Sequence, residues 1–172
     1  MTGAGMRDPG RPIFLVGFMG AGKTTVGRAL ARMIGWDFVD LDEQAVAADG
    51  RAIPRIFEAD GEAFFRRLEG RLIADLGGRT RLVVACGGGT YVQESNRLLI
   101  DRIGRAVWIH VPVEQALARC DGSPARPLLK DRAQAEALYR SRLAAYRLAP
   151  LRVDAAGLTP EEVAERIATL TA

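Results

Sequence analysis

One eight-residue segment, residues 17–24, constrains the fold more than any other part of the chain. It reads Gly-Phe-Met-Gly-Ala-Gly-Lys-Thr and matches the pattern GxxxxGK followed by Ser or Thr, in which glycines let successive main-chain amides point at phosphate oxygens. An apolar run, residues 13–17, precedes it, and residues 23–34 follow with apolar side chains at helical spacing. The segment therefore lies between a strand and the start of a helix, whose positive end favours an anion. We predict that it binds the phosphates of a nucleotide.

Two polar side chains of this loop have predicted roles of their own. The Lys23 ammonium is expected to reach the outer phosphates, and the Thr24 hydroxyl is expected to bind magnesium, which prefers oxygen ligands. The alternative is a glycine turn with an exposed lysine, but the strand before it and the helix after it favour a phosphate site. The predicted nucleotide-binding residues of the loop are Gly20, Ala21, Gly22, Lys23, Thr24 and Thr25.

Further short apolar segments alternate with helical patterns along the chain. After the first strand, we expect strands at residues 37–40, 82–86, 106–111 and 151–154. Strands that are apolar throughout and alternate with helices indicate a parallel sheet with both faces covered. The expected fold class is therefore α/β.

Two segments do not fit this alternation. Residues 43–76 carry two or three helical patterns interrupted by glycine and proline, which is more than one crossover needs, so they predict an insertion that can cover a substrate. Residues 121–132 are polar and contain Gly122, Pro124 and Pro127. This composition predicts a mobile loop.

Length and charge limit the number of domains and the kinds of partner. A chain of 172 residues can bury one core but is short for two domains, so we expect a disordered tail over residues 1–11 and a single domain over residues 12–172. The formal net charge is only +3 and the basic residues are spread along the chain, so nothing indicates nucleic-acid binding. No apolar run approaches the roughly 20 residues of a membrane-spanning helix. We expect a soluble monomer with no membrane partner.

The cysteines and the single histidine suggest no metal centre. Cys86 and Cys120 have neither CxxC spacing nor neighbouring histidines, which also argues against a disulfide framework and favours a reducing cytoplasm. His110 lies within an expected strand. We interpret it as a core residue whose ring nitrogens have hydrogen-bond partners.

Two carboxylates stand at the end of the second expected strand. Asp40 and Asp42 are two residues apart, and in an extended segment this spacing points both side chains to one side. The carboxyl ends of strands are where α/β sheets bind ligands, so one carboxylate could face a metal and the other a substrate. The alternative is a helix start, because Asp caps helices well.

Five segments, taken in order and spacing, resemble the shikimate kinase family: residues 18–28, 40–42, 57–69, 86–89 and 126–129. The resemblance extends from about residue 13 to the C-terminus. It implies a three-layer P-loop kinase fold with a five-stranded parallel sheet in the order 2-3-1-4-5, a helical substrate-binding insertion over residues 43–76, and a lid over residues 121–132. It also implies transfer of the γ-phosphate of ATP, with one Mg²⁺, to the 3-hydroxyl of shikimate in aromatic amino acid biosynthesis.

The resemblance further implies an acceptor site. Arg66 and Arg142 would hold the shikimate carboxylate, Arg142 in an Arg-x-x-x-Tyr arrangement with Tyr146, and Asp42 would accept hydrogen bonds from ring hydroxyls and act as the base. Glu69 could orient Arg66 from one helical turn away, or the two could form a plain surface ion pair. Bare main chain for the substrate ring would come from Gly87, Gly88 and Gly89.

On the nucleotide side, the resemblance implies that Asp40 holds magnesium through water and that Arg126 moves in with the lid to neutralise the transferring phosphoryl group. The predicted catalytic residues are thus Asp42, Lys23 and Arg126. Arg119 would lie near adenine. The loop of residues 155–158 is apolar, so its contacts with adenine must be hydrophobic or made by the main chain.

Two other functions remain open at this point. A kinase for another small polyol acid, such as gluconate, would need the same phosphate loop, because that loop does not define the acceptor. A nucleotide-binding switch or a non-catalytic relative would keep the same fold. The chain has no NKxD segment with which a GTPase reads guanine, and every motif position expected to carry charge is filled.

Overall fold

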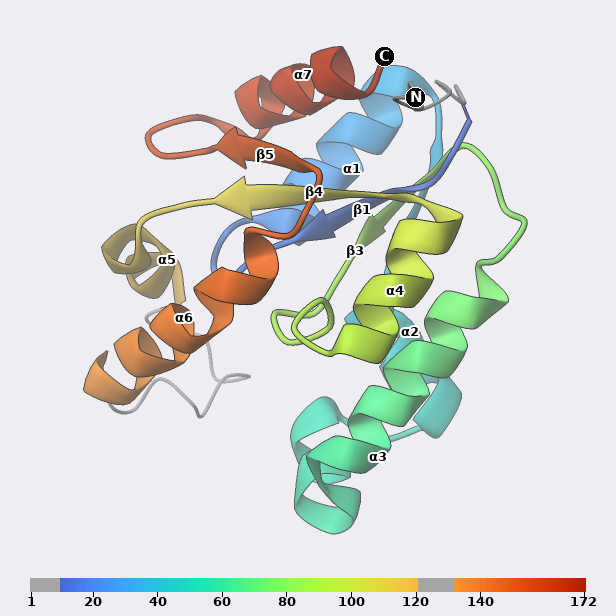
Figure 1. The fold of residues 1–172 in the computed structure, drawn as a ribbon, viewed down its shortest axis with the longest axis vertical. Coiled ribbons are helices and arrows are strands. Elements are labelled where there is room, and N and C mark those ends of the chain that lie inside the picture. Colours follow the sequence, from blue (N-terminus) through green and yellow to red (C-terminus); the bar gives the residue numbers. More distant parts are fainter. Residues whose placement is uncertain (1–9, 121–131) are drawn as a thin grey trace, which may run out of the picture.

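The computed structural model describes residues 10–120 and 132–172. Within these residues the strands form one five-stranded parallel sheet in the order β2-β3-β1-β4-β5 (Figure 1). This confirms the expected α/β class and strand order. The strands are β1 (Ile13–Val16), β2 (Asp37–Asp40), β3 (Leu82–Ala85), β4 (Arg105–His110) and β5 (Leu151–Asp154).

The central position of β1 determines where the site forms. Every residue of β1 and β3 is buried, as expected for apolar strands covered on both faces. Leu15 of β1 pairs with Ala85 of β3 on one side and with Val107 of β4 on the other. Because the strands are parallel, the loops that follow β1, β2 and β3 leave the same edge of the sheet.

Helices cover both faces of this sheet. On one face α1 (Lys23–Ile34) packs against α7 (Pro160–Thr171), while α4 (Glu94–Ile103) lies against the other face (Figure 1). Thr159 starts α7 with a capping box, in which its hydroxyl accepts from the Glu162 amide and the Glu162 carboxylate accepts from the Thr159 amide. Two further helices, α5 (Val113–Cys120) and α6 (Arg132–Tyr146), flank residues 121–131. The predicted lid lies outside the described residues except for its last residue, Arg132, which begins α6; Arg126 lies outside them.

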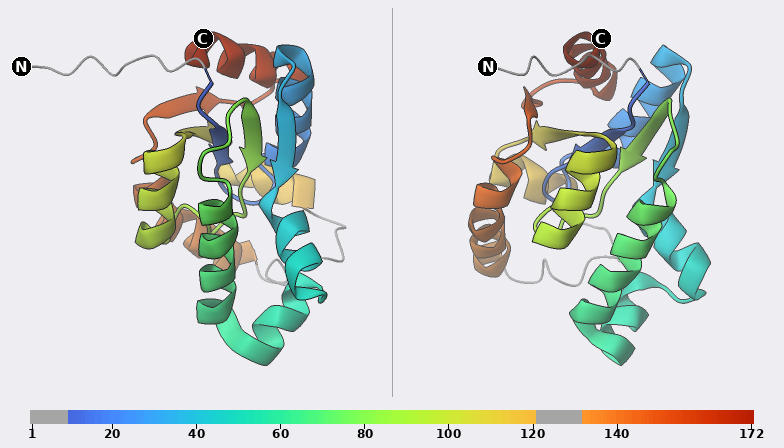
Figure 2. Two further views of the ribbon diagram at one scale, coloured as in Figure 1. Left: turned by 90° about the vertical axis from the view of Figure 1, so that its right-hand side faces the viewer. Right: turned by 45° about the vertical axis from the view of Figure 1, so that its right-hand side comes forward.

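The insertion between β2 and β3 is an arm of helices. It consists of α2 (Leu41–Asp49) and α3 (Ile53–Asp75), and it extends away from the sheet (Figure 2). Gly61 bends α3, because its φ of 77° and ψ of 173° are not helical. The arm has a small hydrophobic core that is distinct from the main core and consists of Ala45, Ile56, Phe65 and Leu68.

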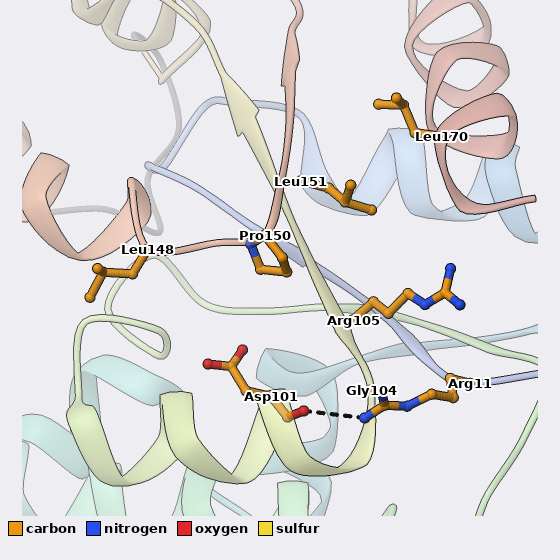
Figure 3. A pocket seen from close by; sticks show the side chains of 8 residues that line it. All are labelled: Arg11, Asp101, Gly104, Arg105, Leu148, Pro150, Leu151 and Leu170. Atoms are coloured by element: carbon orange, nitrogen blue, oxygen red, sulfur yellow. Dashed lines mark hydrogen bonds between the residues drawn. The ribbon is translucent and has the colours of Figure 1, made fainter. Parts of the chain in front are cut away.

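A cavity of about 440 Å³ lies beside the starts of β4 and β5, at the end of the sheet opposite to the loops that follow β1, β2 and β3 (Figure 3). Arg11 lines it and donates to the carbonyls of Asp101 and Arg102 at the end of α4. Arg105 also lines it and donates to the carbonyl of Thr171 at the end of α7. Each of the two guanidinium groups therefore binds carbonyl groups at the negative, C-terminal end of a helix.

The expected tail ended at residue 11, and its first nine residues lie outside the described part of the chain. Gly10, which follows them, accepts a hydrogen bond of 2.8 Å from the Arg81 amide. In the described residues, no helix combines the length and apolar character needed to cross a lipid bilayer.

Candidate active site

The loop after β1 has the backbone that phosphate binding requires. Gly17, Gly20 and Gly22 all have positive φ, at 145°, 76° and 91°. A Cβ on Gly20 would collide with the carbonyl oxygen of Ala116 in α5, so only glycine fits there. Among the described residues, no side chain caps the start of α1 at Gly22. The helix thus begins in the form that suits a bound anion.

Lys23 lies inside this loop. The side chain is 9% exposed, and its Nζ donates to the carbonyls of Gly17 at 2.8 Å and Phe18 at 2.9 Å. The loop therefore surrounds the ammonium group, which we expect from the sequence to reach phosphate oxygens.

Asp40 connects the phosphate loop to the arm. Its Oδ2 accepts from the Thr24 hydroxyl at 2.6 Å, and its Oδ1 accepts from the amides of Asp42 at 2.9 Å and Glu43 at 3.3 Å. Asp40 is thus the N-cap of α2 as well as a neighbour of the loop, so the alternative of a helix start is confirmed. Asp40 as a whole is 8% exposed.

The expectation that Asp40 and Asp42 lie on one side of an extended segment was wrong. The strand ends at Asp40, and Asp42 lies in the first turn of α2. The chain turns here because the Asp40 carboxylate accepts the amides that open the helix. Asp42 instead reaches the glycine segment after β3 from the helix.

The three glycines after β3 bring the predicted acceptor residues together. A Cβ on Gly87 would come within 2.9 Å of Asp42 Oδ1, and one on Gly88 within 3.1 Å of Arg142 Nη1. A Cβ on Gly89 would collide with the guanidinium of Arg66. Each glycine therefore faces one of these residues, which come from α2, α6 and α3. Side chains at these positions would displace them.

Arg66 is held by two carboxylates of its own helix. Glu62 Oε1 lies 3.0 Å from Nη2 and is 59% exposed, whereas Glu69 Oε2 lies 2.7 Å from Nη1 and is fully buried. Glu69 also accepts a hydrogen bond from the Thr90 hydroxyl. Burial raises the pKa of Glu69 and the Asp42 carboxylate adds to this, while Arg66 and Thr90 act against it. Glu69 is therefore buried between α3 and the loop after β3, and the alternative of a plain surface ion pair was wrong for it.

Arg142 lies between an aromatic ring and the glycine segment. Its Cζ is 5.8 Å from the centre of the Phe18 ring. Four residues further along α6, the Tyr146 hydroxyl donates to the Gly88 carbonyl. Burial raises the pKa of Tyr146 to about 12, although Arg142 partly offsets this, so the hydroxyl keeps the proton that it donates. Sequence reasoning missed Phe18 and Thr90 as neighbours of the site, because neither residue type signals such a contact.

A pocket of about 260 Å³ adjoins the phosphate loop on the side away from the arm. Arg119 lines it and makes long contacts of 3.4 and 3.5 Å with the carbonyls of Gly20 and Ala21. The apolar part of the wall is contributed by α1, the loop after β5 and α7, through Val26, Ala155, Leu158, Pro160 and Val163. Arg119 and the loop of residues 155–158 thus line one pocket, and α7 adds a part of the wall that the sequence did not predict.

His110 has hydrogen-bond partners, as expected, but it is only partly buried. Its Nδ1 lies 2.7 Å from Asp154 Oδ1 and its Nε2 lies 3.3 Å from the Tyr139 hydroxyl. The ring is 24% exposed because it lies at the end of β4 rather than in its middle.

Comparisons with known proteins agree on one family. The family model described as shikimate kinase matches residues 19–171. The shikimate kinase of Geobacter sulfurreducens is 45% identical over 163 residues, which cover 93% of this chain and 90% of that relative. The shikimate kinase of Persephonella marina is 39% identical, with 91% of this chain and 96% of the relative covered.

Solved structures give the same result. A shikimate kinase from Acinetobacter baumannii in complex with shikimate superposes with a TM-score of 0.88 at 37% identity, covering 93% of this chain and 92% of that one. A gluconokinase from Sinorhizobium meliloti reaches a TM-score of 0.58 at 18% identity, with 96% and 95% covered, which shows a shared fold alone.

Proposed function

As a member of the shikimate kinase family, this chain is an ATP-dependent small-molecule kinase, and we propose that it transfers the γ-phosphate of ATP to the 3-hydroxyl of shikimate. The products are shikimate 3-phosphate and ADP, and the reaction is a step of aromatic amino acid biosynthesis. One observation carries the choice of acceptor. Asp42, Arg66 and Arg142 all face the glycines at 87–89, at the edge of the sheet from which the phosphate loop also leaves.

ATP binds with its phosphates in the loop of residues 17–24 and its adenine in the pocket beside Arg119. In support, the loop surrounds Lys23, and the pocket directly adjoins Ala21 and Gly22. Its apolar wall suits the faces of a purine, which leaves the ring edge to main-chain groups. When phosphates enter, Lys23 exchanges its contacts with the loop carbonyls for phosphate oxygens.

Shikimate binds against the bare main chain of Gly87, Gly88 and Gly89. Arg66 and Arg142 hold its carboxylate, since guanidinium groups bind carboxylates through two parallel hydrogen bonds. Asp42 accepts hydrogen bonds from the ring hydroxyls and takes the proton of the hydroxyl that attacks the γ-phosphorus. An acid with several hydroxyl groups matches this set of charges.

The residues around Thr24 fit a magnesium ion. The Thr24 hydroxyl and the Asp40 carboxylate lie 2.6 Å apart beside the loop, and both supply the oxygen atoms that Mg²⁺ prefers. Asp40 is kept in place by the two amides of α2 that it accepts. Thr24 would hold the ion directly and Asp40 through water. The ion, when bound with ATP, neutralises charge on the β- and γ-phosphates.

Catalysis then rests on positioning and charge. Lys23 stabilises negative charge that develops on the phosphates, and Asp42 orients and deprotonates the attacking hydroxyl. We assign Arg126, which belongs to the expected lid outside the described residues, to the transferring phosphoryl group. Closure of that lid would exclude water and suppress hydrolysis of ATP.

The direct test is product analysis after purified protein is incubated with ATP, magnesium and shikimate. We expect ADP and shikimate 3-phosphate in equal amounts. Asp42→Asn should lower kcat by about 100-fold or more while the KM for ATP stays within about twofold. A higher kcat/KM for gluconate than for shikimate would overturn the choice of acceptor, and so would unaltered turnover in the Asp42 variant.

We further expect a cytoplasmic monomer. In the described residues, Cys86 and Cys120 are not joined in a disulfide, as is usual in a reducing compartment. In the described residues, the exposed large hydrophobic side chains belong to five different segments and are Met33, Val46, Leu98, Leu148 and Leu170. Light scattering at micromolar concentration would check the monomer.

A further inference from the structure

Phe18 connects the phosphate loop with the helix that carries Arg142. Its main chain belongs to the loop, where its carbonyl accepts from Lys23 Nζ at 2.9 Å and from the Ala21 amide at 3.2 Å. Its side chain packs against α6 and is 2% exposed. One residue thus touches the nucleotide half of the site through its backbone and the acceptor half through its ring.

Two side chains of α6 contact the Phe18 ring. The Tyr139 ring meets it edge to face, with the centroids 5.2 Å apart and the planes at 85°. The Arg142 guanidinium carbon lies 5.8 Å from the ring centre. Residues three apart share one side of a helix, so the same face of α6 presents both contacts. The edge-to-face contact with Tyr139 fixes how the ring faces Arg142.

The contact with Phe18 suits an arginine that must bind a carboxylate. A guanidinium group within about 6 Å of a ring centre is attracted by the electron-rich face of the ring. The attraction leaves the N–H groups of the guanidinium edge available for hydrogen bonds in the plane of the group. Arg142 Nη1 lies 3.1 Å from the position of a Cβ on Gly88, so this nitrogen borders the proposed acceptor pocket.

We propose that Phe18 is a positioning residue that holds Arg142 in the orientation needed for the carboxylate of the acceptor. The role rests on the proposed function, because it takes Arg142 as a carboxylate-binding residue. We expect Phe18 to contact neither the acceptor carboxylate nor the transferred phosphoryl group. Replacing its side chain should therefore weaken acceptor binding. The phosphate loop should be unaffected, because any residue at position 18 supplies the same main-chain carbonyl.

The first test replaces Phe18 with Leu, which keeps an apolar side chain but removes the aromatic face. We expect the KM for shikimate to rise about fivefold. The KM for ATP and kcat should change less than about twofold. Phe14→Leu is the matched control. Phe14 is buried like Phe18, but it lies near the start of β1 and packs beside Gly104, away from Arg142. This variant should lower the melting temperature without altering the KM for shikimate.

A double-mutant cycle separates positioning from packing. In an Arg142→Ala background, Phe18→Leu should change kcat/KM for shikimate by less than about twofold, because the group that Phe18 positions is absent. Equal effects of Phe18→Leu in both backgrounds would overturn the proposal. An unchanged KM for shikimate in folded Phe18→Leu protein would overturn it too.

If Phe18→Leu does not fold, Phe18→Met serves in its place, because it also lacks an aromatic face and fills a similar volume. Failure of this proposal is distinguishable from failure of the proposed function. Arg142→Ala alone should raise the KM for shikimate whatever Phe18 does. If it leaves that KM unchanged, the acceptor site is wrongly assigned; if it raises the KM but Phe18→Leu does not, only the role of Phe18 is wrong.

Discussion

The hydroxyl of Thr24 donates a hydrogen bond of 2.6 Å to the carboxylate of Asp40, and so joins the first turn of α1 to the end of β2. The other oxygen of the same carboxylate caps α2. A single side chain therefore connects the phosphate loop, the sheet and the arm. Loss of this carboxylate should affect both the stability of the arm and the proposed magnesium site, and two variants can separate these effects.

Asp40→Asn should keep the cap and lose the charge, because Asn caps helices about as well as Asp. We expect a small change in melting temperature but a higher magnesium concentration for half-maximal activity. Asp40→Ala loses both functions and should also cost about 1 kcal/mol of unfolding free energy. Chemical denaturation and magnesium titrations of kcat would measure the two effects. Equal magnesium dependence in wild type and Asp40→Asn would argue against the metal role.

Gly89→Ala should damage the acceptor half of the site alone. The added Cβ collides with the Arg66 guanidinium, and a displacement of a catalytic-site group by about 1 Å can lower the rate by about 100-fold. We expect a loss of this order in kcat/KM for shikimate with little change in the KM for ATP. Gly10→Ala is the control, since its Cβ would make only ordinary contacts of 3.6 Å with Thr80. Full activity of Gly89→Ala would contradict the arrangement described.

The two carboxylate partners of Arg66 should contribute very differently to stability. Glu69→Ala leaves a partly buried guanidinium and Thr90 without their buried partner, which typically costs about 3–5 kcal/mol of unfolding free energy. Glu62→Ala removes an exposed partner and should cost about 1 kcal/mol or less. Urea unfolding of both variants provides the comparison. Similar losses would mean that burial does not distinguish the two pairs.

Asp154 should make the stability of the β4–β5 edge depend on acidic pH. Hydrogen bonding to Arg152, and to a smaller extent to His110, lowers the pKa of this carboxyl from the ordinary 3.8 in spite of partial burial. A lowered pKa stabilises the fold above pH 3.8, and the contribution disappears as the pH falls through the folded-state pKa. Because Asp154 is 61% exposed, the effect should be less than about 1 kcal/mol.

The variant Asp154→Asn lacks this titration. At pH 7 it should therefore be slightly less stable than wild type, and the difference should vanish on acidification below the pKa of the folded state. Urea unfolding at a series of pH values would show this. A difference that persists unchanged into strong acid would mean that the loss arises from packing rather than charge.

Much of the fold follows from the sequence because its signals are local. Short, continuous apolar runs mark β1, β3 and β4 as buried strands, and the glycines of residues 17–24 mark the phosphate loop wherever it occurs. Strand ends differ by one residue, as at Cys86, which follows β3 but was expected within it. The order of the strands and the predicted roles of Arg66 and Arg142 came from the resemblance to a family, because no local sequence pattern indicates them.

The rest of the site depends on contacts between distant segments. Phe18 is one apolar residue among many in the sequence, and only the fold places it beside Arg142. The Tyr146 hydroxyl reaches Gly88 because the end of α6 lies beside the loop that follows β3, which spacing along the chain does not reveal. Asp42 was misplaced for a related reason. The spacing of apolar residues indicates where a strand lies. It does not indicate the residue at which the strand ends and a side-chain cap starts a helix.

The small core of the arm, described above, makes the arm a separable unit. Ala45, Ile56, Phe65 and Leu68 pack together, and Leu72 is packed against both this cluster and the main core. Backbone amides in α2 and the first half of α3 should therefore exchange with solvent through local openings that leave the sheet intact. Natural selection can likewise change residues of the arm while the strands beside the phosphate loop keep their packing.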